Sequence, residues 1–383
     1  MHYPHIKIPY LLKSELNELF VTNSIRSFAL SMISVFLPIF FLKTGYSIIH
    51  VLLFYIIGIS GGTLFTYFAL KFAARTGAKH SIIMSYPLLI LFFGCLFNIE
   101  NFSVNFTVLG LSLLFSAAEA FYYMGFHIDF ARSSKKSDES KDISIFNALS
   151  VVLTIIGPLI GAVIATFFGF KILFLIVIFI LSFSFIPLLF SADIREKINI
   201  EFKGILDDER SFIIFFSEGV SDIGRRIFWP TLIFLVGINL TEIGGVFTIA
   251  NLVLALFTLY VGHHSIGKMK HNFLRFGSVL HSISLFIRGF LKSLAPIAAA
   301  TTFGAISLTM MDVPFKGIFY SNSKRRGVYM IYLREFYLHF GRIFSISLAL
   351  TSYLLYENII FSFIALIILG GVATLFMSLI KDE

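Results

Sequence analysis

Long apolar blocks constrain this chain more than any other feature of its sequence. Each is close to the length of about 20 residues that spans a bilayer core as a helix. The blocks are continuous, without the residue-by-residue alternation of a membrane barrel, so they predict transmembrane helices. We expect twelve spans, near residues 17–42, 48–70, 80–97, 105–130, 143–168, 171–190, 211–236, 243–262, 273–291, 296–320, 328–355 and 358–380.

Composition supports this interpretation. Hydrophobic residues make up 57% of the chain, charged residues 14%, and the mean hydropathy is +0.89. A soluble domain carries about a quarter charged residues, so we expect an all-α integral membrane protein. Cys95 is the only cysteine, which excludes disulfides and cysteine-based metal centres. The sequence predicts neither a metal nor a cofactor.

The formal net charge of +8 has two explanations, a nucleic-acid or lipid partner, or basic cytoplasmic loops. A cytoplasmic N-terminus places about twenty Lys and Arg inside and leaves about three, Lys43, Lys171 and Lys292, outside. The first twenty residues lack the pattern of a cleaved signal peptide. We therefore predict a monomer in the bacterial inner membrane with both termini cytoplasmic, in contact with lipid and not with nucleic acid.

The longest polar run, Ser191 to Arg210, divides the chain. It predicts a bundle over 1–191, a cytoplasmic linker over 192–210 and a second bundle over 211–383. SSKKSDESKD precedes a helix with Gly157, and SNSKRRG precedes a helix with Gly341, while Pro38 and Pro230 close comparable helices. Unless this is a chance similarity of apolar helices, it indicates two pseudo-symmetric six-helix bundles, as in transporters whose halves rock about a midplane site.

Two motifs carry a family resemblance. FAARTGAKHSI, with Arg75, Gly77 and Lys79 in place, resembles the loop signature of the major facilitator superfamily, although that signature's Gly, Leu, Asp and second Arg are replaced by Leu70, Phe72, Ala74 and Ala78. In the family, the missing Asp helps to lock the halves together on the cytoplasmic side. GPLIGAVIATFFGFK resembles the family's fifth-helix element through Gly157, Pro158 and Gly161, whose small residues permit close helix packing and whose proline bends the helix. The resemblance implies the major facilitator fold and is nearly silent on substrate.

Ionisable residues at bilayer depth are costly and mark functional sites. They occur here in the first, fourth, seventh, tenth and eleventh spans, and the first four of these line the central cavity in the family that the chain resembles. As substrate-binding or coupling residues we predict Arg26, Glu119, Asp222, Arg225, Arg226, Asp312 and Lys316. As gate or inter-bundle residues we predict Arg26, Glu218, Arg75, Gly77, Lys79, Arg334, Glu335 and Arg342.

Three of these residues carry specific expectations. Glu119 has no charged neighbour within a turn of its own helix, so we expect it to bind and release the coupling proton. The repeat places Arg26 opposite Glu218, which predicts a charge pair between the halves; the alternatives are that Arg26 turns to Asp222 or Glu119, or reaches the headgroups. His127 and Asp129 are expected at the membrane interface.

These features favour a secondary active transporter that moves a small polar or anionic solute by alternating access, coupled to protons. The deep charges, six basic and five acidic, are the reason for expecting such a solute. The alternatives are a transporter-derived receptor or lipid-moving protein, or a membrane-embedded enzyme. His-Glu-x-x-His and Walker motifs are absent from the sequence, so we expect no enzymatic activity.

Overall fold

The computed structural model describes residues 15–133, 140–193, 208–265 and 267–381. Regular structure within these ranges is entirely helical, as predicted. The first part of the chain forms α1 (Glu15–Ser31), α2 (Leu37–Lys43), α3 (Ile48–Thr76), α4 (Ala78–Phe97), η2 (Ile99–Asn101), η3 (Phe106–Leu111), α5 (Ser112–Ser133), α6 (Ser140–Phe167), α7 (Gly169–Ser184) and η4 (Ile186–Leu189). The second part forms α8 (Glu209–Ile223), η6 (Gly224–Phe228), α9 (Trp229–Leu235), α10 (Leu240–His264), α11 (Lys268–Arg288), α12 (Leu294–Arg326), α13 (Val328–Tyr356) and α14 (Ile359–Met377).

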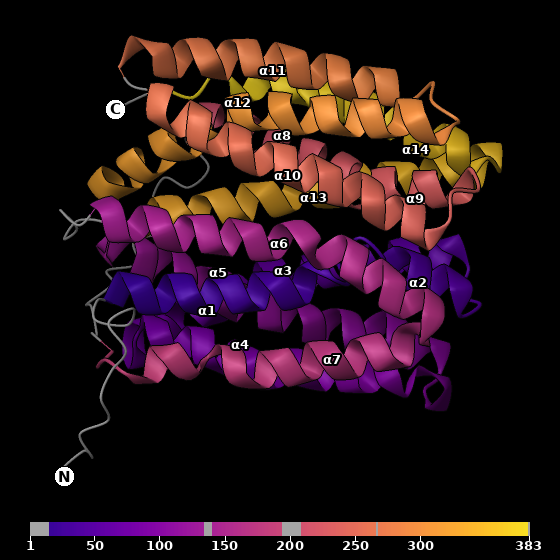
Figure 1. Cartoon of the computed structure of the whole chain (residues 1–383), viewed down its shortest axis with the longest axis horizontal. Coiled ribbons are helices and arrows are strands. Elements are labelled where there is room, and N and C mark those ends of the chain that lie inside the picture. The colour runs from indigo at the N-terminus through magenta and orange to yellow at the C-terminus, as the bar shows by residue number, and fades with distance from the viewer. Residues whose placement is uncertain (1–14, 134–139, 194–207, 266, 382–383) are drawn as a thin grey trace.

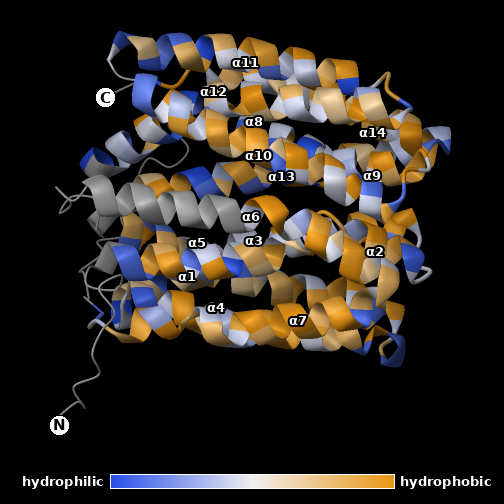
Figure 2. Ribbon diagram, viewed as in Figure 1, coloured by the Kyte–Doolittle hydropathy of each residue, from blue (hydrophilic) through white to orange (hydrophobic). Residues whose placement is uncertain are grey.

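The helices run side by side along the longest axis of the molecule (Figure 1). Helices α1 to α7 form one half of the picture and α8 to α14 the other. Hydrophobic residues dominate their middle sections, and hydrophilic residues gather towards the two ends (Figure 2). Eight described helical segments are long and apolar enough to cross a membrane. The count of twelve spans and the domain boundaries at 191/192 and 210/211 stay predictions, and residues 194–207 of the linker lie outside the described ranges.

Two short helices occupy equivalent places in the two halves. The first predicted span consists of α1, a turn and α2, and the seventh consists of α8, η6 and α9. Both α2 and α9 have seven residues, and Pro38 and Pro230 lie in their first turns. Proline fits there because the first helical N–H groups lack an intrahelical partner. The two prolines therefore start equivalent helical segments, where the sequence had suggested that they close comparable helices.

Glycines bring equivalent pairs of helices into backbone contact. A Cβ on Gly161 of α6 would lie 1.9 Å from the carbonyl oxygen of Met32, directly after α1. A Cβ on Gly341 of α13 would lie 2.0 Å from the carbonyl oxygen of Phe216 in α8. Gly157 also faces the end of α1, at Ser31, and Pro158 lies inside α6. The helix-packing role predicted for Gly157 and Gly161 is consistent with this geometry.

The halves meet mainly through α3 with α13 and α6 with α10. Two buried apolar clusters also include residues of both halves. We call the end at which Ser191 and Asp208 lie the linker end, and the opposite end, at which Lys43 and Val236 lie, the far end. One cluster includes Phe41 and Trp229 towards the far end, and the other includes Ala69 and Leu333 towards the linker end.

A buried ion pair fixes the linker end of the first half. Lys79, at the start of α4, lies 2.7 Å from Glu18 of α1, and their side chains are 1% and 2% exposed. The Ser191 hydroxyl donates to the same Glu18 carboxylate at 2.7 Å and also contacts Lys79. Gly77 has a backbone φ of +115°, a conformation that residues with a side chain rarely adopt. Lys79, predicted at the gate between the halves, thus contacts residues of the first half instead.

Candidate functional site

A cavity of about 590 Å³ lies between the halves. Its lining contains the aromatic residues Tyr55, Tyr123 and Trp229 and many ionisable side chains. The ionisable residues are Glu119, His127, Asp222, Arg225, Arg226, His281, Arg288, Lys316, Arg334, Glu335, His339 and Arg342. Most of the predicted coupling residues therefore gather in one place, and Asp312 is tied to it through its 2.7 Å ion pair with Lys316.

Asp222 is the centre of the largest charge cluster. Its carboxylate lies 2.6 Å from Arg225, 2.7 Å from Arg226 and 2.6 Å from Arg342 of α13. Arg225 and Arg226 belong to the π-helix η6, a rare local form that often occurs at functional sites. One buried carboxylate therefore faces three guanidinium groups, and the cluster carries surplus positive charge.

Arg26 pairs with Glu119 within the first half. Its guanidinium carbon also lies 3.5 Å from the centre of the Tyr122 ring, a cation–π arrangement. The pair that the repeat predicted, Arg26 with Glu218, is not formed. Its stated alternative, Arg26 with Glu119, is formed because α1 and α5 lie in direct contact.

Glu218 instead pairs with Arg334 of α13, which also contacts Glu335 at 2.7 Å. Glu335 lies 3.7 Å from the Nε2 atom of His127 on α5, and the other ring nitrogen of His127 lies 2.9 Å from the Tyr320 hydroxyl on α12. His127 therefore makes polar contacts with two helices of the other half, α12 and α13.

His127 is 9% exposed and Asp129 is 0% exposed, so both are buried within the protein. Other helices cover that face of α5, and the expectation that the two residues lie at the depth of the membrane interface stays a prediction. Arg75 is exposed at the linker end of α3 and does not line the cavity.

Sequence reasoning missed His281 and Arg288 of α11. Both are buried, with 1% and 4% exposure, and both line the cavity. Arg288 lies near a predicted span end, where arginine commonly reaches the headgroups. The seven-residue spacing, which places both side chains on one helical face, was the available signal.

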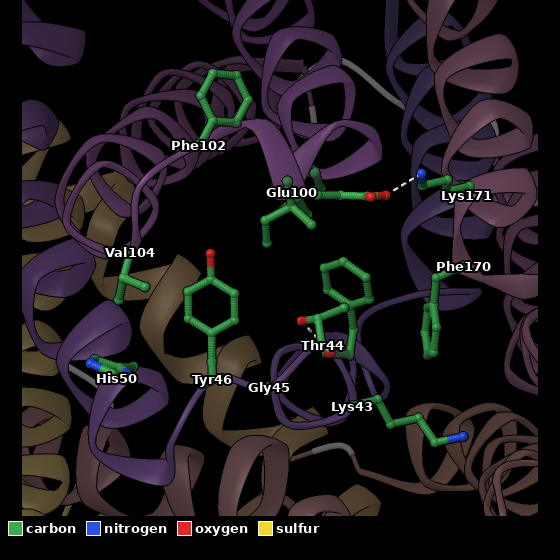
Figure 3. Close-up of a pocket in the computed structure, with 13 residues that line it drawn as sticks. Lys43, Thr44, Gly45, Tyr46, His50, Glu100, Phe102, Val104, Phe170 and Lys171 are labelled. Atoms are coloured by element: carbon green, nitrogen blue, oxygen red, sulfur yellow. Dashed lines mark hydrogen bonds and ion pairs between the residues drawn. The ribbon is translucent and has the colours of Figure 1, made fainter.

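A second cavity, of about 630 Å³, lies at the far end of the first half. Figure 3 shows Tyr46 pointing into its centre and the Lys171–Glu100 ion pair at its edge. Its lining comes entirely from residues 40–171. The central cavity is the better candidate site because both halves contribute to it and because it gathers the deep charges. Among the described residues, no group of three or more His, Cys, Asp or Glu is placed to hold a metal ion.

A helical membrane protein with a charged cavity between its two halves has the architecture of transporters of small solutes. The chain is a member of the Major Facilitator Superfamily, whose sequence model matches residues 19–346. Crystal structures of the nucleoside transporter NupG share its fold. A point mutant of NupG has a TM-score of 0.70 and the other NupG structure 0.69, each at 11% identity over 96% of this chain and 100% of that one. No curated protein matches the sequence.

Proposed function

We propose that this protein is a secondary active transporter that moves a small anionic solute by alternating access, coupled to protons. The observation that supports an anion is the charge balance of the cavity and its ion-pair partners. The basic residues are Arg26, Arg225, Arg226, Arg288, Lys316, Arg334 and Arg342, and the acidic residues are Glu119, Glu218, Asp222, Asp312 and Glu335. With neutral histidines, two positive charges remain, and an anionic solute would balance them.

Alternating access draws support from contacts between the halves towards both ends. At the far end α2 contacts α9, and towards the linker end His127 contacts Tyr320. Each contact would separate in one of the two states. The pseudo-symmetry, the two six-helix domains, the cytoplasmic position of both termini and residence in the bacterial inner membrane are part of the same proposal.

Glu119 is our candidate for the proton site. It lines the cavity, its side chain is 22% exposed, and its partner Arg26 is 3% exposed. A proton on Glu119 would cancel its attraction for Arg26, so protonation and the position of Arg26 are linked. We expect Glu119→Gln to abolish gradient-driven uptake and to retain downhill exchange. Concentrative uptake at the wild-type rate in this variant would contradict the assignment.

The substrate can be found in two stages. A thermal-shift screen of metabolites on the purified protein, including nucleosides because NupG transports them, selects solutes that stabilise it. Proteoliposome uptake of each selected solute is then measured with and without a proton gradient. We expect anions to be selected over their neutral analogues and to accumulate only with the gradient. Flux of neutral solutes alone, or gradient-independent equilibration, would refute the proposed anion specificity or the coupling, respectively.

A further inference from the structure

Arg288 is a buried cation without an acidic partner among the described residues. It is the last residue of α11, lines the central cavity and is 4% exposed. Its Nε atom is buried and has no hydrogen-bond partner within the described part of the chain. A guanidinium in this setting is costly unless an anion or a hydrogen-bond acceptor meets it.

The neighbouring helix makes room for this side chain. A Cβ on Gly304 of α12 would lie 2.0 Å from a terminal nitrogen of Arg288 and 2.8 Å from the Ser284 hydroxyl. Glycine at position 304 therefore leaves the space that the guanidinium occupies beside α12. Helix α11, which is not among the five spans with predicted deep charges, therefore places a cation in the cavity wall.

His281 lies beside Arg288 in the wall of the same cavity. It lies seven residues before Arg288 on the same helical face and is 1% exposed. Its Nδ1 atom lies 3.2 Å from the Ser307 hydroxyl, whereas its Nε2 atom is buried without a partner among the described residues. Two buried polar groups of one helix face thus lack partners beside the same cavity.

Two residues of the seventh predicted span, Arg225 and Trp229, also line the cavity near Arg288. Arg225 lines the same cavity as Arg288 and His281, and its positive charge acts on both. The Trp229 ring lies 5.1 Å from the Arg288 guanidinium carbon, and its own N–H donates to Thr301 at 3.1 Å. The Trp229 side chain is 1% exposed, and the part of its ring that lines the cavity is an apolar surface beside the cationic groups.

We propose that Arg288, Arg225 and His281 bind the carboxylate of a small organic anion whose apolar body packs against Trp229. A planar guanidinium matches a carboxylate through two parallel hydrogen bonds. In the tautomer in which the Nδ1 atom of His281 accepts from the Ser307 hydroxyl, the Nε2–H group donates a third hydrogen bond to the carboxylate. This inference rests on the proposed function, since the bound anion would be the transported solute.

Trp229 is the only tryptophan in the chain, so its fluorescence reports on this site. The experiment measures quenching of the full-length purified protein by iodide, an anion, and by acrylamide, which is neutral, at constant ionic strength. We expect iodide to quench wild-type Trp229, and benzoate to protect it where benzamide does not. Arg288→Met should abolish iodide quenching and leave acrylamide quenching unchanged.

Two further variants control for charge and folding. Lys292→Gln removes one positive charge at an exposed position outside the cavity lining, and we expect iodide quenching to persist. Arg288→Lys keeps the charge without the planar fork, so iodide should still quench while the half-protecting benzoate concentration rises about tenfold. This variant also tests the proposal if Arg288→Met does not fold.

Equal iodide quenching in wild type and Arg288→Met would overturn the site, and unchanged benzoate protection in Arg288→Lys would overturn the paired hydrogen bonds. Protection by inorganic phosphate but not by benzoate would refute the carboxylate assignment. The assay requires no transport. Anion-specific protection without proteoliposome flux would therefore refute the proposed function alone, and flux without Arg288-dependent quenching would refute this site alone.

Discussion

Replacing Lys79 with methionine tests whether the lysine of the signature loop is structural. The substitution leaves Glu18, whose side chain is 2% exposed, without its counter-charge. Removing one partner of a buried ion pair costs about 3–5 kcal/mol. The hydrogen bond from Ser191 remains and offsets about 1 kcal/mol, which leaves about 3 kcal/mol.

This loss of unfolding free energy should lower the melting temperature by a measurable amount. An unfolding entropy of about 2.1 cal/mol/K per residue gives about 0.8 kcal/mol/K for 383 residues, so Tm should fall by about 4 °C. The assay is thermal unfolding of the purified protein at a fixed heating rate. In the double variant Glu18→Gln/Lys79→Met neither charge remains, and we expect most of the loss to be recovered. Lys43→Met, at an exposed position, should change stability by less than about 0.5 kcal/mol.

Two outcomes would contradict a structural role for the Lys79–Glu18 pair. If Lys79→Met melts with the wild type but changes the transport rate, the lysine acts at the gate, as the family resemblance implied. If the double variant is less stable than both single variants, the two residues do not act as a pair.

Two other predictions concern packing and capping. Gly161→Ala places a methyl group against the carbonyl of Met32 and should cost about 1–3 kcal/mol of stability, whereas Gly245→Ala, with nothing within 4 Å of the new carbon, should be neutral or stabilising in the same unfolding assay. Asp208 caps α8: partial burial alone would raise its pKa, but hydrogen bonds from Ser211 and Arg326 hold that pKa below its usual value. A carboxylate whose pKa is lower in the folded than in the unfolded protein stabilises the fold at pH values above its unfolded pKa. Asp208→Ala should therefore lower the free energy of unfolding by about 0.5–2 kcal/mol, and this loss should be constant above about pH 5 and shrink below about pH 4. An equal loss in the two pH ranges would contradict the prediction.

Features that depend on local composition were predictable from the sequence. The apolar blocks gave the helical class, and the i, i+4 spacing of Asp312 and Lys316 predicted a pair that the structure forms at 2.7 Å. The equivalence of Pro38 and Pro230 follows from a pattern that repeats along the chain.

Partners on different helices were less predictable, because helix rotation and neighbours decide them. Glu218 and Asp222 share a helix face in sequence, yet Glu218 pairs with Arg334 and Asp222 with Arg342. The repeat placed Arg26 near Glu218 and gave no weight to the nearer contact between α1 and α5. Arg288 was missed because its position near a predicted span end suggested a side chain that reaches the headgroups, whereas the room beside Gly304 lets it turn into the cavity wall.

The glycine contacts of α6 bear on how the halves can move. Gly161 brings α6 against the chain that follows α1, while Gly244 of α10 lies so close that an added Cβ would be 2.8 Å from the carbonyl oxygen of Pro158. Small residues let the two backbones approach this closely, so few side-chain atoms separate α6 from α10 at this point. In the proposed alternating-access cycle, the α6–α10 contact at Gly244, towards the far end, would act as a pivot, about which a small rotation would separate α2 from α9. A rotation about an axis there displaces the linker end most, and the contacts of His127 with Tyr320 and Glu335 lie on that longer arm.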